Sequence, residues 1–329
     1  MPVLICGGAG YIGSHCVYEL IEKGEKVVVI DNLQTGHINA VHKSAIFYQG
    51  DIRDIDFLNT VFSKHNIEAV IHFAANSLVG ESMTEPLKYF DNNVYGMEVL
   101  LKAMVLNNVR KIVFSSSAAV YGEPKSIPIK EFDLAEPTNP YGETKLAMEK
   151  IMKWVDTAHG IKYVSLRYFN VAGAHPNGLI GEDHNPETHL IPLVLQVPLK
   201  KREKINVYGN DYNTKDGTCI RDYIHVMDLI SAHLLALEYL RKGNDSNIFN
   251  LGNGLGFTVN EIIEASEEVI ETSIAKEIIS RRPGDPAILI ASSEKAKNIL
   301  GWVPEYTEIK DIISSAWEFH RKNVNGYEK

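Results

Sequence analysis

The chain of 329 residues has little cysteine and no long hydrophobic run. Its three cysteines, Cys6, Cys16 and Cys219, include no CxxC pair. Disulfide frameworks use even sets of cysteines in small secreted chains, so we expect buried thiols in a reducing compartment. No stretch approaches the ~20 apolar residues that span a bilayer, and the N-terminus lacks the pattern of a signal peptide. These absences predict a cytoplasmic protein with no membrane partner.

The chain also lacks an excess of positive charge, since its formal net charge is -9. A nucleic acid needs a basic face on its partner, so the composition argues against nucleic-acid binding. Phosphate ligands are still allowed, because backbone amides at the start of a helix bind them without net positive charge. Hydrophobic residues make up 45% of the chain, enough for a large core, and the length fits two domains.

Short β-branched runs alternate with helical stretches through the first half of the chain. The predicted strands are Val3–Cys6, Val27–Ile30, Ile46–Tyr48, Ala69–Phe73, Ile112–Ser115 and Tyr163–Arg167. Most lack alternating polar residues, as expected when helices cover both faces of a parallel sheet. Ile12, Cys16 and Leu20 recur at every fourth residue and form one apolar helix face. Strand, helix, strand in repetition predicts a doubly wound parallel sheet of Rossmann type, in the α/β class.

The alternation stops near Asn170, where loop-like segments rich in Gly, Pro, His and acidic residues begin. We therefore expect a dinucleotide-binding domain over residues 1–170. A second, smaller α/β domain for the substrate is expected mainly over residues 171–329. Residues 218–252 are a candidate return to the first domain, because Ile248–Leu251 has the pattern of a strand that can join the first sheet.

A glycine-rich segment, Gly7 to Gly13, follows the first predicted strand and opens the first predicted helix. It satisfies GxGxxG from Gly8 and GxxGxxG from Gly7. The glycines allow a tight turn and the close approach of a pyrophosphate to the helix N-terminus. Asp31 ends the second strand at the spacing of a ribose-binding carboxylate. Such a carboxylate would repel a 2′-phosphate, so NAD is favoured over NADP; alternatively, Asp31 only caps a turn with Asn32.

A tyrosine and a lysine with three residues between them occur three times, as Tyr121/Lys125, Tyr141/Lys145 and Tyr306/Lys310. Short-chain dehydrogenases use this spacing, which puts both side chains on one helix face so that the ammonium stabilises a phenolate. Pro124 disrupts the first copy as a helical pair. The third copy is far in sequence from any cofactor strand and is interpreted as a solvated surface pair.

The middle copy has the surroundings that catalysis needs. Asn139 and Pro140 are suited to the N-cap and first position of a helix, which places Tyr141 in its positive first turn. A free tyrosine titrates near ~10, so a base near neutrality needs both the helix dipole and Lys145. Ser117, after the fifth strand, supplies a third polar group. The other interpretation is an ordinary amphipathic helix start.

Longer segments resemble UDP-glucose 4-epimerases, within the extended short-chain dehydrogenases. The matching segments are GGAGYIGSH (Gly7–His15), DNL (Asp31–Leu33), VGES (Val79–Ser82), FSSSAAVYG (Phe114–Gly122), NPYGETK (Asn139–Lys145), LRYFNVAGA (Leu166–Ala174), YGNDYNTKDGTCIRDYIHVMDL (Tyr208–Leu229), FNLG (Phe249–Gly252) and RRPGDPA (Arg281–Ala287). They cover the chain from Gly7 almost to its end, and the later segments are much more specific than the glycine turn.

The resemblance implies a UDP-sugar substrate, tightly held NAD and a homodimer. Tyr141 would take the proton of the sugar 4-hydroxyl, with Ser117 as hydrogen-bonding partner or relay, and the 4-keto sugar would rotate before it is reduced on its other face. The cofactor contacts are expected at Gly7, Gly10, Tyr11, Ile12, Gly13, Asp31, Asn32, Asp51, Ile52, Phe73, Ala74, Asn92, Ser115, Tyr141, Lys145 and Tyr168. The substrate contacts are expected at Ser117, Asn170, His189, Leu190, Tyr208, Arg221, Tyr223, Arg282, Asp285 and Leu289.

Three residues depart from the family pattern. Ser77 stands where many members have a lysine near the sugar and phosphates. His189 stands where members commonly have asparagine, and either replaces it at UDP or is an unrelated loop histidine. Leu289 replaces a frequent tyrosine beside the sugar 2-position, which leaves room for an N-acetyl group and predicts additional use of UDP-N-acetylglucosamine and UDP-N-acetylgalactosamine. No HExxH motif or carboxylate cluster is evident in the sequence, so no metal is expected.

Two rival functions fit the same fold. A nucleotide-sugar 4,6-dehydratase needs an acid and a base after the catalytic serine or threonine, and this chain has Ala118 and Ala119 there; a decarboxylase is the related alternative. A regulatory protein that senses NAD without turnover typically loses the tyrosine or the lysine, whereas this chain keeps both.

Overall fold

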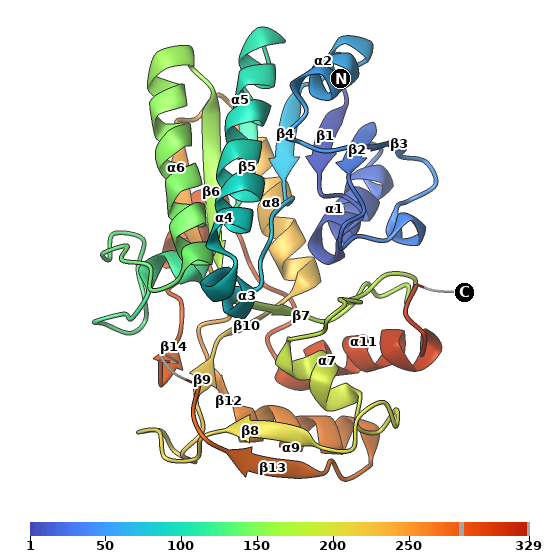
Figure 1. The fold of residues 1–329 in the computed structure, drawn as a ribbon, viewed down its shortest axis with the longest axis vertical. Helices are drawn as coiled ribbons and strands as arrows, with labels where there is room; N and C mark the ends of the chain where they lie inside the picture. Colours follow the sequence, from blue (N-terminus) through green and yellow to red (C-terminus); the bar gives the residue numbers. More distant parts are fainter. Residues whose placement is uncertain (283–285, 328–329) are drawn as a thin grey trace.

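The computed structural model describes residues 1–282 and 286–327, and its largest element is a seven-stranded sheet (Figure 1). All neighbouring strands in this sheet are parallel, in the order β11-β6-β5-β4-β1-β2-β3. The strands are β1 (Val3–Cys6), β2 (Val27–Asp31), β3 (Ile46–Gln49), β4 (Ala69–His72), β5 (Lys111–Ser115), β6 (Lys162–Tyr168) and β11 (Asn247–Leu251). The predicted doubly wound fold is thereby confirmed.

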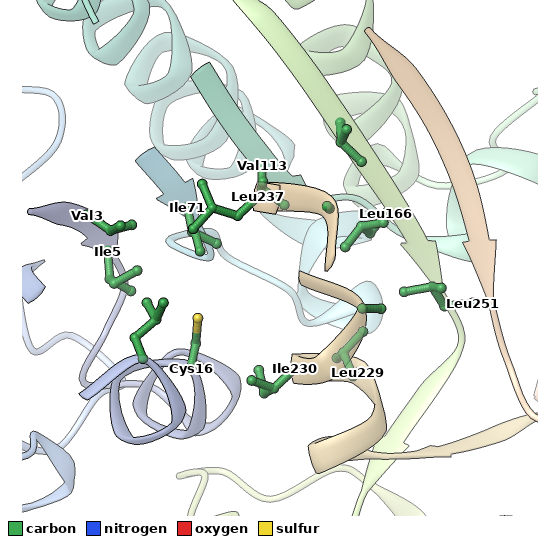
Figure 2. Close-up of a cluster of buried hydrophobic side chains, with 14 of the residues drawn as sticks. Val3, Ile5, Cys16, Ile71, Val113, Leu166, Leu229, Ile230, Leu237 and Leu251 are labelled. Carbon is green, nitrogen blue, oxygen red and sulfur yellow. The ribbon is translucent and has the colours of Figure 1, made fainter. Parts of the chain in front are cut away.

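Helices cover both faces of the sheet, which explains why its strands are apolar throughout. Helices α1 (Tyr11–Glu22) and α8 (Val226–Arg241) cover one face. Helices α2 (Ile55–Lys64), α5 (Gly96–Leu106) and α6 (Pro140–His159) cover the other. Successive residues of each strand enter opposite cores. Figure 2 shows the first core, where Cys16 of α1 and Leu237 of α8 face the strands.

All three cysteines are buried, as the sequence predicts. Burial, together with the charge of Asp31, raises the pKa of the Cys6 thiol to about 12, and burial also raises the pKa of Cys16. Both thiols therefore stay protonated near neutral pH and pack as small apolar side chains.

The later part of the chain builds smaller sheets below the main one in Figure 1. The strands of these sheets are β7 (Asn170–Ala172) with β10 (Tyr223–His225), β8 (Ile205–Tyr208) with β13 (Lys276–Ile279), and β9 (Ile220–Arg221) between β12 (Phe257–Thr258) and β14 (Ile288–Leu289). The remaining α-helices are α3 (Val79–Thr84), α4 (Pro86–Tyr89), α7 (Leu190–Leu195), α9 (Val259–Ile270), α10 (Glu294–Leu300) and α11 (Ile309–Lys322). Among the described residues, no helix has both the length and the apolar character needed to cross a bilayer.

The chain returns to the main sheet after leaving it. Helix α8 packs against α1, and β11 then pairs with β6, with Phe249 opposite Leu166. The strand predicted at Ile248–Leu251 therefore belongs to the first sheet. The division into domains near residue 170 stays a prediction.

The glycine turn between β1 and α1 generates a test of this fold. A Cβ on Gly13 would lie 2.0 Å from the Gly7 carbonyl oxygen, so Gly13→Ala must displace the turn. We expect a loss of about 3 kcal/mol in the free energy of unfolding, at the upper end for overpacked sites. Gly80→Ala on helix α3 is the control, because a Cβ on Gly80 meets nothing within 4 Å. Alanine suits a helix better than glycine, so this variant should gain ~0.5–1 kcal/mol in the free energy of unfolding. Urea unfolding measures both, and equal effects would contradict the turn's role.

Candidate active site

The glycine turn and the segment after β4 form a narrow crevice at the carboxyl edge of the sheet. Gly7 has a φ of 83°, and a Cβ there would lie 2.6 Å from the Ala74 nitrogen. Glycine therefore keeps the two segments in contact while the crevice stays open. The crevice is lined by Gly7, Gly10, Ile30, Asp31, Asn32, Gln34, Thr35, Gly50, Ile52, Phe73, Ala74, Ala75, Asn76 and Asn92. Its position and glycine cradle fit a dinucleotide.

Asp31 is buried at the end of β2 and joins the glycine turn to the next loop. Its carboxylate accepts hydrogen bonds from the Ala9 nitrogen at 3.0 Å and the Leu33 nitrogen at 2.8 Å. Burial raises its pKa, and these two bonds act in the opposite direction. Asp31 thus caps local backbone and also lines the crevice. Its contact with a ribose stays a prediction.

The structure places half of the predicted cofactor residues in this crevice. Gly7, Gly10, Asp31, Asn32, Ile52, Phe73, Ala74 and Asn92 line it. Asp51 lies after β3 instead, where hydrogen bonds from Arg53 lower its pKa to about 2. Tyr11, Ile12 and Gly13 begin α1, and the Tyr11 hydroxyl donates to the Gly173 carbonyl at 2.6 Å. Gln34, Thr35 and Asn76 also line the crevice but were not predicted, because loop residues outside the motif carry no periodic signal.

Helix α6 presents Tyr141 and Lys145 as the sequence predicts. Asn139 caps the helix by accepting from the Gly142 nitrogen at 2.9 Å, and Pro140 is its first residue. The Lys145 ammonium donates to the Ser115 carbonyl at 2.8 Å and lies 5.8 Å from the centre of the Tyr141 ring. Ser117 lies near Tyr141 and acts to lower its pKa. Three of the predicted groups therefore meet where β5 ends and α6 begins.

The electrostatics of this group are dominated by burial. Burial lowers the pKa of Lys145 to about 7, although the charge of Glu149 acts to raise it. Burial also raises the pKa of Tyr141, and the nearby Ser117 hydroxyl opposes that rise. Tyr141 is therefore a phenol at neutral pH in this structure. Its ionisation depends on nearby positive charge, which Lys145 carries only below about pH 7.

The other two tyrosine–lysine copies have different surroundings. Tyr121 is buried, donates to the Asn250 side chain at 2.7 Å and accepts from Arg167 at 2.9 Å. Lys310 is exposed and pairs with Glu268, as predicted for a surface pair. Tyr306 departs from that prediction, because its ring stacks on His225 with centroids 4.0 Å apart.

A buried charged network lies at the end of β5, beside the predicted catalytic residues, and it was not predicted from the sequence. Glu149, one turn after Lys145 on α6, accepts from the Ser116 hydroxyl at 2.5 Å and from the Arg167 Nε at 3.0 Å. Both members of the Glu149–Arg167 pair are buried. On the other side, the Ser115 hydroxyl lies 2.9 Å from His233 Nε2. The one sequence pattern that points to this network is the regular spacing of Tyr141, Lys145 and Glu149 along one helix face.

Several predicted substrate residues are neighbours in the smaller sheets. The Arg282 guanidinium lies 3.9 Å above the Tyr208 ring. Strand pairing places Arg221 beside Leu289 and Asn170 beside Tyr223. His189 stands at the N-cap of α7, just before Leu190, and hydrogen-bonds to Glu182. Tyr168, a predicted cofactor residue, is the last residue of β6. Asp285 lies outside the described residues.

Leu289 connects the smaller sheets to the catalytic elements. It packs against an apolar cluster that includes Val120 and Leu146. Val120 belongs to the 3₁₀ helix capped by Ser117, and Leu146 follows Lys145 on α6. Leu289 therefore lies beside the elements that carry the predicted catalytic side chains.

A glycine-lined crevice on a doubly wound sheet, beside a helix that carries tyrosine and lysine, is typical of the short-chain dehydrogenase class. The model of the NAD dependent epimerase/dehydratase family matches residues 3–252. The UDP-glucose 4-epimerase of Halalkalibacterium halodurans is 59% identical over 327 residues, covering 99% of this chain and 98% of the relative. The chain therefore belongs to this family and, within it, to the UDP-glucose 4-epimerases.

Solved structures agree with the assignment. A crystal structure of a UDP-glucose 4-epimerase has a TM-score of 0.99 and 59% identity, and covers 100% of both chains. The UDP-glucose 4-epimerase of Bifidobacterium longum in complex with NAD+ and UDP has a TM-score of 0.93 and 42% identity, and covers 99% of this chain and 100% of that one.

The choice of catalytic tyrosine is open to a direct test. Tyr141→Phe keeps the packing of the ring but removes the proton acceptor, so kcat should fall by at least ~10²-fold. Tyr121→Phe and Tyr306→Phe are controls. Tyr121→Phe should cost stability, since it leaves buried Asn250 and Arg167 with one partner fewer, but kcat of both controls should change far less. An equal loss of kcat in Tyr306→Phe, or in Tyr121→Phe that keeps the wild-type stability, would show that another copy is the catalytic one.

Proposed function

We propose that the chain interconverts UDP-glucose and UDP-galactose by inverting the sugar C4 hydroxyl, with NAD as a permanently bound cofactor. The observation that carries the proposal is the meeting of Tyr141, Lys145 and Ser117 at the end of β5, in a chain 59% identical to a UDP-glucose 4-epimerase over nearly its full length. When bound, NAD supplies the acceptor and donor of the C4 hydride.

In the proposed mechanism, Tyr141, Lys145 and Ser117 have separate roles in the transfer of one proton. Tyr141 removes the proton of the 4-hydroxyl as C4 becomes a ketone, and later returns it to the same oxygen, after the sugar has turned its other face to the cofactor. The charge of Lys145 stabilises the phenolate between these two events. Ser117, which lies near Tyr141, orients the hydroxyl that reacts. Because oxidation and reduction occur at the same carbon, the enzyme needs no net redox partner.

Inversion requires that the UDP group stay fixed while the keto sugar turns. Arg221 and Arg282 suit the diphosphate, since each guanidinium can donate two parallel hydrogen bonds. The Tyr208 ring, against which Arg282 stacks, suits the uracil. Asn170, Tyr223, Leu190 and Asp285 complete the proposed contacts with UDP, and Leu289 borders the sugar; the His189 side chain instead contacts Glu182.

The rival functions make different products. A dehydratase needs an acid and a base beside the 4-keto sugar, but Ala118 and Ala119 occupy the 3₁₀ helix after Ser117. A decarboxylase would not use UDP-galactose, and an NAD sensor would turn over nothing. Incubation with UDP-galactose and no added NAD should yield UDP-glucose. A dehydrated 4-keto product, or no product from protein that contains NAD, would refute the proposal.

The cofactor should survive purification, because the reaction regenerates it in place. Denaturation should release NAD(H) rather than NADP(H). Asp31→Ala should reduce the amount retained, because it removes the crevice carboxylate that also bonds the glycine turn. Asp56→Ala, at an exposed position on α2, is the control and should retain the wild-type amount. Chromatography of the released nucleotide measures its identity and its amount. A preference for NADP would overturn the assignment of NAD as the cofactor.

The size of the side chain at position 289 leads to a prediction about which sugars the enzyme accepts. A side chain smaller than tyrosine beside the sugar 2-position leaves space for an N-acetyl group. The wild type should therefore also interconvert UDP-N-acetylglucosamine and UDP-N-acetylgalactosamine. Leu289→Tyr should lose that activity selectively, by a discrimination of ~1–3 kcal/mol, the scale for filling a small pocket. The test is to measure kcat/KM of both proteins on both substrate pairs. Equal losses of activity on the two pairs, or a wild type that is inactive on N-acetyl sugars, would refute the proposed role of Leu289.

We also propose that the chain forms a homodimer through the outer face of α4, α5 and α6. Leu87, Leu106 and Trp154 are 81%, 66% and 69% exposed, and Figure 1 shows α5 and α6 side by side. Large exposed apolar side chains on adjoining helices are typical of a subunit interface. Sedimentation as single 36.8 kDa chains would contradict this proposal.

We also propose that the protein is located in the cytoplasm. Its support is the set of buried cysteines, which suits a reducing compartment. Recovery of the protein outside the cytoplasmic fraction of lysed cells would contradict it.

A further inference from the structure

The loop that leads into α7 brings two histidines and two glutamates together. They are Glu182, His184, Glu187 and His189. Each offers one potential ligand atom, and the four atoms lie within 4.8 Å of one another. The sequence reasoning missed this cluster, because its spacing, E-x-H-x-x-E-x-H, lies in a loop and matches no helical zinc motif.

Glu182 is the centre of the cluster. Its side chain is only 3% exposed, and its Oε1 lies 3.1 Å from the Nδ1 of His184. The same oxygen also contacts the Nδ1 of His189. Two imidazole nitrogens from one loop therefore point at one buried carboxylate oxygen.

Glu187 is held so that one of its oxygens faces the cluster. Its Oε1 accepts hydrogen bonds from the backbone nitrogens of Thr188 at 2.7 Å and His189 at 2.8 Å. Its Oε2 lies 3.8 Å from His184 Nδ1. Backbone bonds that fix a carboxylate in this way are the outer-shell support that metal ligands usually have.

The loop is also fixed from outside the cluster. Asp183 accepts from the Tyr327 nitrogen at 2.9 Å, and its carbonyl oxygen lies 2.8 Å from His37 Nε2. The His184 ring packs edge-on against Tyr11 of α1, with centroids 6.1 Å apart. The four potential ligands are therefore held near one another before any ion arrives.

The chemistry of the donors selects the ion. Two imidazole nitrogens and two carboxylate oxygens are typical of Zn²⁺ and similar transition metals, whereas Mg²⁺ and Ca²⁺ prefer oxygen alone. A dication between two carboxylates and two neutral imidazoles leaves no net charge in this partly buried place. Four protein ligands fill a tetrahedral shell, which is the arrangement of a structural site.

We propose that Glu182, His184, Glu187 and His189 bind one divalent transition metal ion, Zn²⁺ by preference, which fastens the loop before α7 against α1. The ion takes no part in the epimerisation. Metal content and thermal unfolding test this site without any measurement of activity, so its failure leaves the proposed function untouched.

The test uses the untagged full chain, stripped with EDTA, supplied with one equivalent of Zn²⁺ and then desalted. Elemental analysis should find about one zinc per chain, and zinc should raise Tm. The double variant His184→Gln/His189→Gln should retain little zinc and show no rise in Tm. His159→Gln, at an exposed histidine at the end of α6, is the control and should behave as the wild type. Co²⁺ in the wild type should give the intense visible bands of a four-coordinate centre.

Three results would overturn the proposal. The first is the absence of zinc from the wild type after desalting. The second is equal zinc in the wild type and the double variant, which would place the ion elsewhere, for example at Glu19, Glu22 and His175, the other cluster of this kind among the described residues. The third is the weak spectrum of six-coordinate Co²⁺ in the wild type. The Co²⁺ spectrum needs no variant, so it decides even if the double variant fails to fold.

Discussion

The buried ion pair between Glu149 and Arg167 is the interaction on which the region of the predicted catalytic residues depends. It joins α6 to β6, and through Ser116 and Tyr121 it also holds the end of β5 and the 3₁₀ helix after it. Removing one partner of such a pair typically costs ~3–5 kcal/mol, because the other charge stays buried without compensation. The geometry of Ser117, Tyr141 and Lys145 therefore rests on a polar network that none of the three belongs to.

The same burial that fixes these residues also sets their chemistry. Lys145 lies in a region that favours its neutral form, and the carboxylate of Glu149 one turn away opposes that tendency. The site thus keeps a lysine that can gain or lose its charge near neutral pH, beside a tyrosine whose ionisation needs that charge. An exposed lysine at the same spacing, such as Lys310 after Tyr306, has no such property.

Local patterns in the sequence were enough to predict the strands of the seven-stranded sheet, the glycine turn and the cap of α6, but not the strands of the smaller sheets. Val3–Cys6 is apolar throughout because both faces of the sheet are covered, and Asn139 needs only its own helix to act as a cap. Contacts between distant segments could not be predicted. The pairing of Glu149 with Arg167 and the stacking of Tyr306 on His225 depend on how the chain folds back. The convergence of Glu182 and His189 depends on a loop conformation that no periodicity encodes.

Strand β11 lies far after β6 in the sequence, and this separation affects how the chain folds during its synthesis. Strand β6 ends at Tyr168, but the strand that pairs with its outer edge is Asn247–Leu251. During synthesis on the ribosome, the backbone hydrogen-bonding groups along that edge stay without their partner until the intervening residues have emerged. An open strand edge is a template for pairing with other chains. The nascent chain is therefore most prone to aggregate in this interval, and translation past Leu251 closes it.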